Sequence, residues 1–249
     1  MNLCTNTIKN LSTASVLVFI LTYIISLNIE NRFFIINSKW ISSNFIYTIT
    51  SGAFASILIV LICEYIKYLN LKQEAENAIF LRMSNLFGQI LIIKYTCTRA
   101  LHSHGIVNQY LIHTTCNNVS ITSDNICGID YTPLWGKTNR VKTILNLYIS
   151  QNHSSIKKFP QKSILFQIAH NEEKRILLQQ GKDSLITYDA PKVKAELIRI
   201  INQTLPILID LDIILTQIDK QCNNRYHWQT TKESLYKYED NYVESNSEQ

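Results

Sequence analysis

Four side chains near the middle of the sequence are of types that ligate metal ions: His102, His104, His113 and Cys116. His102 and His104 form an HxH motif, and His113 and Cys116 are three residues apart, so they would share one face of a helix. A metal site needs such convergence of nitrogen and sulfur ligands. Their spacings match none of the common zinc patterns. We therefore expect four unrelated polar and core side chains, and the sequence predicts no metal.

The sequence carries no motif of a known catalytic type. It has no glycine-rich phosphate loop, no serine or cysteine nucleophile motif and no HExxH. Asp210, Asp212 and the charged segment 171–175 are more typical of solvated helix faces than of acid–base pairs. We expect a protein that is not an enzyme and has no cofactor.

The densest cluster of turn residues surrounds Pro133, between Gly128 and Gly136. The aromatic loop Tyr131–Trp135 within it has two interpretations. It could line a binding pocket, because aromatic loop residues often carry function. The favoured interpretation is a loop that closes one end of a helical bundle.

The elements that hold these residues are predicted to be helices. The chain has only 6 Gly and 4 Pro, where average usage would give roughly 17 and 12. Residues that interrupt helices are therefore scarce, and no alternating strand pattern is convincing. The sequence predicts an all-α fold. From about Lys67 onward the chain has 21 basic and 17 acidic residues, and this net charge of +4 is too mild and scattered for a nucleic-acid-binding surface.

Two stretches without charged residues predict a transmembrane hairpin over residues 1–66, with spans at about 11–29 and 45–65. A helix needs about 20 apolar residues to cross the hydrocarbon core. The first stretch could instead be a cleaved signal peptide, but no small-x-small cleavage site follows it. A spanning helix is therefore favoured.

The positions of Lys and Arg near the spans predict the orientation of the hairpin. The loop between the spans contains Arg32 and Lys39. Four basic residues flank the spans on the other side: Lys9, Lys67, Lys72 and Arg82. This balance favours a hairpin with the N- and C-termini in the cytoplasm.

Small residues form two i, i+4 pairs in the second span, Ser51 with Ala55 and Gly52 with Ser56. Such pairs let membrane helices approach closely. They could form a packing face for the first span or for another copy of the chain. The alternative is that they have no specific role, since small residues are common in membrane helices.

The second span continues without a break into an amphipathic segment. We expect one helix from about residue 45 to about 101, acting as a stalk, with Gly88 as the position where it could bend. A cytoplasmic helical domain is expected over 67–221, and a polar, partly disordered tail over 222–249.

Four further helices are expected in the cytoplasmic domain. They cover about 106–121, 140–151, 162–180 and a last helix capped by Asp189 and Pro191, with a kink at Pro206. The last helix has the clearest apolar stripe: Val193, Leu197, Ile201, Leu205, Leu208, Leu211, Leu215 and Ile218.

The architecture resembles the two-span membrane effectors of bacterial anti-phage systems, the retron-associated ones among them. The resemblance covers the two N-terminal spans and the apolar-to-amphipathic join at residues 63–72. It implies a membrane-perturbing effector in a bacterial cytoplasmic membrane whose soluble domain senses a trigger. The residues themselves favour a membrane-anchored interaction or signalling module without catalysis. Both remain open, with the lipid bilayer and a protein partner or second copy as expected partners.

Overall fold

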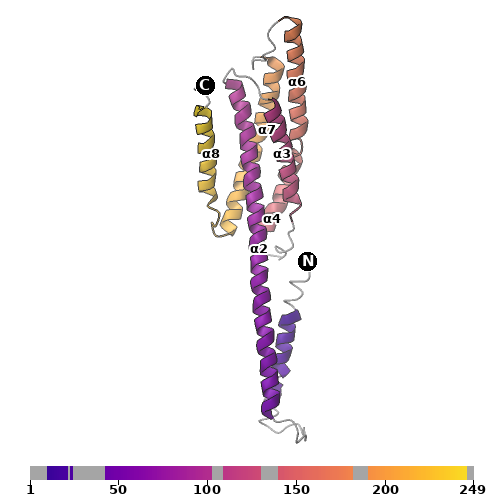
Figure 1. Ribbon diagram of the computed structural model, residues 1–249, viewed down its shortest axis with the longest axis vertical. Helices are drawn as coiled ribbons and strands as arrows, with labels where there is room; N and C mark the ends of the chain where they lie inside the picture. Colours follow the sequence, from indigo (N-terminus) through magenta and orange to yellow (C-terminus); the bar gives the residue numbers. More distant parts are fainter. Residues whose placement is uncertain are drawn as a thin grey trace. The chain divides into compact units, whose positions relative to one another are not determined.

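The computed structural model describes residues 10–21, 23–24, 43–102, 109–129, 140–181 and 190–245 (Figure 1). These residues form helices joined by turns, and no strand occurs among them. The predicted all-α fold is therefore confirmed. His104, Asp189 and the loop Tyr131–Trp135 lie outside the described residues.

The chain divides into two compact units, Met1–Glu74 and Ala75–Gln249. We expected the boundary at 66/67, eight residues earlier. The difference has a clear cause in burial: every described side chain before Ala75 is exposed or half-buried, and Ala75 is the first buried one. The two units are described separately below.

The helix α2 spans Ser43–His102 without interruption, which confirms the long helix expected over 45–101. It contains no proline, and its glycines do not break it. At Gly88 an added Cβ would come no closer than 4.0 Å to any neighbour, the nearest being Leu235. A helix of 60 residues is far longer than the average of about 12.

Within the part of the chain that the structure describes, one helix is long and apolar enough to cross a membrane, over Ser51–Leu101 of α2. Its most apolar window is not buried. The described part of the first expected span is a shorter apolar helix, Asn10–Leu21. The rings of Phe19 and Phe54 lie 6.0 Å apart between these two helices of the first unit.

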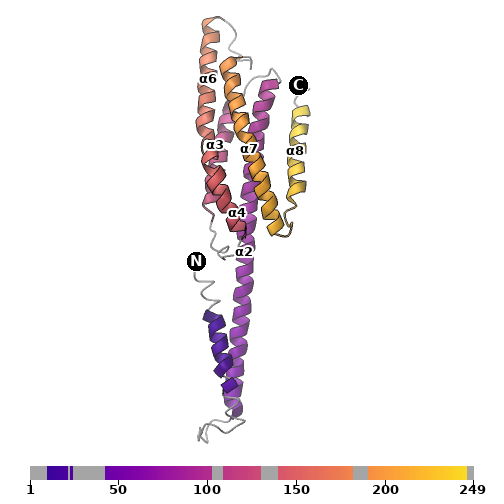
Figure 2. The ribbon, with the colours of Figure 1, turned by 180° about the vertical axis from the view of Figure 1, so that it is seen from behind.

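The second unit contains the rest of α2 and the helices α3 (Gln109–Cys127), α4 (Arg140–Tyr148), α5 (Ser154–Ile156), α6 (Phe159–Gln179), α7 (Pro191–Gln221) and α8 (Trp228–Ser245). A π-helix, η2 (Ile149–His153), joins α4 to α5. Helix α6 packs against both α3 and α7, and both views show it at the edge of this unit opposite α8 (Figures 1 and 2). Apolar side chains from each of these α-helices form one buried core.

Helix boundaries follow local signals where such signals exist. Pro160 stands in the first turn of α6 and Pro191 begins α7, where a missing N–H costs nothing. Gly181 has a φ of +66° directly after α6, the left-handed conformation that ends helices. By contrast, the helix expected over 140–151 changes from α4 to the π-helix η2 after Tyr148. No glycine or proline stands at this position to signal the change.

Most of the polar tail expected from residue 222 onward is helical, because Trp228–Ser245 form α8. The tight turn before it holds Asn223, Asn224 and His227 at positive φ. The side chain of Trp228 is buried, and its ring lies edge-on to Phe87 at 5.1 Å. One buried aromatic residue thus anchors a segment whose average composition is polar.

Candidate functional site: a polar cluster between α3 and the π-helix

The predicted metal-ligand candidates are not brought together. His102 ends α2 and His104 lies outside the described residues. Cys116 is buried, and burial raises the pKa of its thiol to about 12. No group of three His, Cys, Asp or Glu side chains that could hold a metal ion occurs among the described residues.

His113 ties α3 to α6 instead of binding a metal. Its Nδ1 lies 2.9 Å from Ser163 Oγ, and its Nε2 lies 3.1 Å from Asn117 Nδ2. Ser163 donates its own hydrogen to the carbonyl of Pro160, so it accepts from His113 Nδ1–H. Asn117 donates to Nε2. This network fixes the neutral Nδ1–H tautomer and occupies both ring nitrogens.

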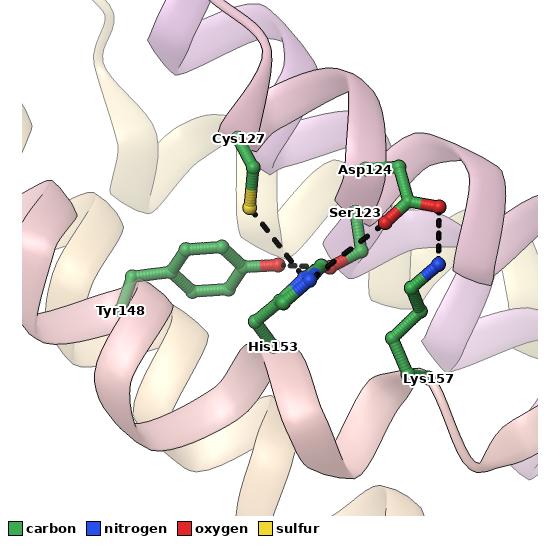
Figure 3. Close-up of polar contacts among 6 residues, drawn as sticks. All are labelled: Ser123, Asp124, Cys127, Tyr148, His153 and Lys157. Carbon is green, nitrogen blue, oxygen red and sulfur yellow. Dashed lines mark hydrogen bonds and ion pairs between the residues drawn. The ribbon is translucent and has the colours of Figure 1, made fainter.

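A second polar cluster, which the sequence analysis did not identify, lies where α3 meets η2 (Figure 3). Ser123 Oγ is 2.8 Å from the Tyr148 hydroxyl and 3.0 Å from His153 Nδ1. Cys127 Sγ lies 3.5 Å from the same ring nitrogen. Ser123 and Tyr148 are fully buried. We call Ser123, Asp124, Cys127, Tyr148, His153 and Lys157 the α3–η2 cluster.

The outer edge of the α3–η2 cluster is charged and more exposed. His153 Nε2 lies 3.7 Å from Asp124 Oδ1. Lys157 donates to the other oxygen of the same carboxylate. Asp124 and Lys157 are each about half exposed. The cluster therefore runs from a buried hydroxyl pair, through one imidazole, to an ion pair at the surface.

The π-helix explains how Tyr148 and His153 reach the same serine. Five residues apart on an α-helix, they would point about 140° away from each other. A π-helix repeats its hydrogen bonds from i to i+5, so residues five apart lie nearly one above the other. Because nothing in the sequence signals η2, spacing alone could not predict this cluster.

The α3–η2 cluster contains the residue types of a nucleophile, a base and a carboxylate that orients the base. His153 Nδ1 is placed to take the proton of Ser123, and Asp124 faces the other nitrogen, as in hydrolytic triads. However, Ser123 Oγ is closed to solvent and already holds two hydrogen-bond partners. In this arrangement no substrate atom can approach Ser123 Oγ. The hydrogen bonds of the cluster instead hold α3 against η2.

The acidic candidates also have structural partners. Asp212 accepts from Trp228 Nε1 at 2.8 Å and from Lys232 Nζ at 2.7 Å, so it fastens α8 to α7 and does not simply face solvent. Glu172 in the segment 171–175 pairs with Lys192 at 2.7 Å, and its side chain is 41% exposed, as expected for a solvated face.

The small-residue pairs of the second predicted span are exposed: Ser51, Gly52, Ala55 and Ser56. Among the described residues, no atom lies within 4 Å of a Cβ added at Gly52. The hydroxyls of Ser51 and Ser56 bond back to carbonyls of their own helix, at 3.1 and 2.9 Å. The N-terminal helix contacts Phe54, which lies about 200° around the helix from Gly52. No described side chain therefore packs on the small face.

No protein-family model, no curated protein and no solved structure matches this chain, so its function has to be inferred from its own residues.

Proposed function

We propose that this chain is a membrane-anchored helical module that acts by binding a protein partner and not by catalysis. The observation that supports the anchor is a change of environment along α2. Large aliphatic side chains around Ile59 and Ile62 are exposed, whereas those from Ile79 to Ile93 on the inward face are fully buried or nearly so. The same helix thus needs two different surroundings.

The exposed part of α2 is suited to lipid. Burying one such side chain stabilises by about 1.5–3 kcal/mol relative to leaving it in water. Six large apolar residues are exposed between 58 and 66: Leu58, Ile59, Val60, Ile62, Tyr65 and Ile66. Soluble monomers rarely expose so continuous an apolar surface. In a bilayer these side chains would no longer be exposed to water, and Tyr65 would lie near the membrane interface.

Two features of the second unit support binding over catalysis. The α3–η2 cluster keeps its hydroxyl groups buried and paired. The outward faces of α6 and α7, in contrast, expose aliphatic side chains such as Leu165, Ile168 and Ile209. Surfaces of this kind in a soluble unit are typical of protein interaction sites.

Extraction of membranes with alkaline carbonate tests the anchor. The full chain should stay in the pellet, and the double variant Ile59→Lys/Ile62→Lys should be released, because each Lys costs about 2.5–3.5 kcal/mol at the centre of a span. The matched control is Leu81→Lys. Leu81 lies on the same helix and is 64% exposed, against 61% for Ile59, yet its substitution should leave the protein in the pellet. Release of the unmodified chain would contradict the proposal.

A second candidate is the membrane-perturbing effector, and one observation favours it. Among the described residues, no atom packs against the face of Gly52, as would be the case if several copies assembled in the bilayer. The two candidates differ in one readout. Expression of an effector slows growth or depolarises cells, whereas expression of a binding module does not.

A further inference from the structure

Helix α8 packs on α2 and runs back along α7 (Figures 1 and 2). On α2, the ring of Phe87 lies edge-on to Trp228 at 5.1 Å, and a Cβ added at Gly88 would lie 4.0 Å from Leu235 Cδ2. On α7, Asp212 accepts hydrogen bonds from two side chains of α8. We call Phe87, Gly88 and Asp212 the α8 seat.

Only the start of α8 is firmly held. Trp228 is buried, and its backbone N–H donates to Asp219 at 2.8 Å. Beyond Trp228, no described side chain of α8 is buried. Elements with few buried side chains open at low free energy, and an isolated helix of this length is marginal in water. We call residues 229–245 the strap. Four of its side chains are half-buried and recur at helical spacing from Trp228: Thr231, Lys232, Leu235 and Tyr236.

The seat is more apolar than the strap that covers it. Phe87 is fully buried, yet Thr231 and Lys232 are two of the four strap side chains on this face. Gly88 also has room for a methyl group, because the nearest atom to an added Cβ is at an ordinary contact distance. Glycine destabilises a helix interior relative to alanine. The strap therefore leaves unfilled a space that reduces the stability of α2.

We propose that the strap is autoinhibitory: it covers the seat on which a basic amphipathic helix of the protein partner docks. The partner itself rests on the proposed function, but the seat does not depend on the membrane anchor. The contacts of α8 indicate the chemistry of the docking helix. Lys232 Nζ lies 2.7 Å from Asp212 Oδ2, and both side chains are half-buried, so the partner helix carries a basic side chain at this place.

Apolar side chains one turn before and after this basic residue would contact Phe87 and the space at Gly88. Helices that bind in grooves are recognised through such anchors at i, i+4 and i+7. A helix with leucine at the place of Thr231 would bury more apolar surface than the strap does. It would therefore displace the strap while Trp228 stays in place.

The strap of a second copy fits the seat less well than such a partner. It would make the same contacts as the strap of the same chain. That strap is already held near the seat by the turn 222–227, at an effective concentration on the order of millimolar. A competing helix has to bind more tightly than α8, which an identical strap cannot do.

A disulfide lock tests whether the strap controls access. Full-length Gly88→Cys/Leu235→Cys is purified in detergent with Cys4 and Cys63 replaced by Ser. Mild oxidation should close a disulfide within one copy, because the two positions are in contact. The probe is a fluorescent peptide of residues 227–245 that carries Thr231→Leu. The reduced chain should bind it, and the oxidised chain should bind at least about tenfold more weakly until reductant is added. Oxidation of the single variant Gly88→Cys should change nothing.

Weakening the strap should have the opposite effect. Leu235→Ser/Tyr236→Ser in the full chain should tighten probe binding about tenfold, because it raises the fraction of chains whose seat is open. The matched control, Gln229→Ser/Glu233→Ser, changes two exposed side chains of the same helix and should leave binding unchanged. A probe with Lys232→Glu should bind at least about tenfold more weakly, because it places a carboxylate beside Asp212.

Three results would overturn the proposal: equal probe binding by the oxidised and reduced lock, equal binding by the weakened strap and its control, or no binding by any variant. A disulfide that forms between copies would assign the seat to the strap of a second copy and would also overturn it. Carbonate extraction does not depend on α8. A chain that stays in the pellet but fails these tests therefore keeps its proposed function and loses only this inference.

Discussion

The hydroxyl of Tyr148 lies 2.8 Å from Ser123 Oγ in the buried interior of the second unit. This contact joins α3 to the residue directly before η2 and places two polar groups where water cannot reach them. Removing either hydroxyl takes one hydrogen-bond partner from the other, and an unsatisfied buried polar group costs about 1–3 kcal/mol.

The first prediction concerns this contact. Ser123→Ala should lower the free energy of unfolding by about 1–3 kcal/mol, because it leaves Tyr148 and His153 each with one partner fewer. Ser150→Ala is the matched control: its hydroxyl is exposed and bonds only to the carbonyl of Leu147, so the loss should be below about 0.5 kcal/mol. Chemical denaturation of both variants measures the difference. Equal losses would mean that the α3–η2 cluster has no stabilising role.

The second prediction concerns the start of α8. Trp228 is buried between Phe80 and Phe87, so Trp228→Ala should cost about 3–5 kcal/mol. Trp228→Phe should cost less, about 1–2 kcal/mol, because Asp212 keeps Lys232 as a partner. The exposed neighbour Gln229→Ala serves as the control, and limited proteolysis in the turn 222–227 reports whether α8 detaches. Unchanged proteolysis of Trp228→Ala would contradict an anchoring role.

The sequence predicted long features better than local ones. The single long helix followed from an uninterrupted apolar and then amphipathic pattern. The end of α6 followed from Gly181 and the start of α7 from Pro191, whereas the start of α6 at Phe159 was expected about three residues later. The helix α8 was not predicted because residues 222–249 are polar on average. Its packing depends mainly on one buried residue, Trp228, which has little effect on that average. The α3–η2 cluster depends on a π-helix that no sequence signal predicts. The five-residue spacing of Tyr148 and His153 therefore did not indicate that both side chains contact Ser123.

The third prediction concerns pH. Burial raises the pKa of the Cys116 thiol from 9.0 to about 12, so folding favours its protonated form. The corresponding stability is complete below pH 9 and is lost as the pH rises toward 12. The loss is at most about 1.4 kcal/mol per pH unit for one thiol. The decline in unfolding free energy above pH 9 should therefore be shallower in Cys116→Ala. Parallel curves for the two proteins would contradict this.

The fourth prediction separates the two candidate functions. Gly52→Leu adds a side chain to an open face, where lipid would tolerate it but a second helix could not approach. If the chain is a binding module, cells expressing the wild type should grow normally and Gly52→Leu should change nothing. If it is an effector, the wild type should slow growth and Gly52→Leu should relieve this at equal protein level. Equal toxicity of both would exclude the small face as an assembly surface.

Thiol labelling of intact cells tests the central claim, which is that α2 anchors a cytoplasmic bundle. Cys222 is unsuitable as a reporter, because it is buried and burial raises its pKa to about 11. Tyr110→Cys provides an exposed position in the bundle, and Ser38→Cys provides one between the two predicted spans. A membrane-impermeant maleimide should label Ser38→Cys in intact cells and should label Tyr110→Cys only after permeabilisation. Labelling of Tyr110→Cys in intact cells, or of neither variant before permeabilisation, would contradict the account.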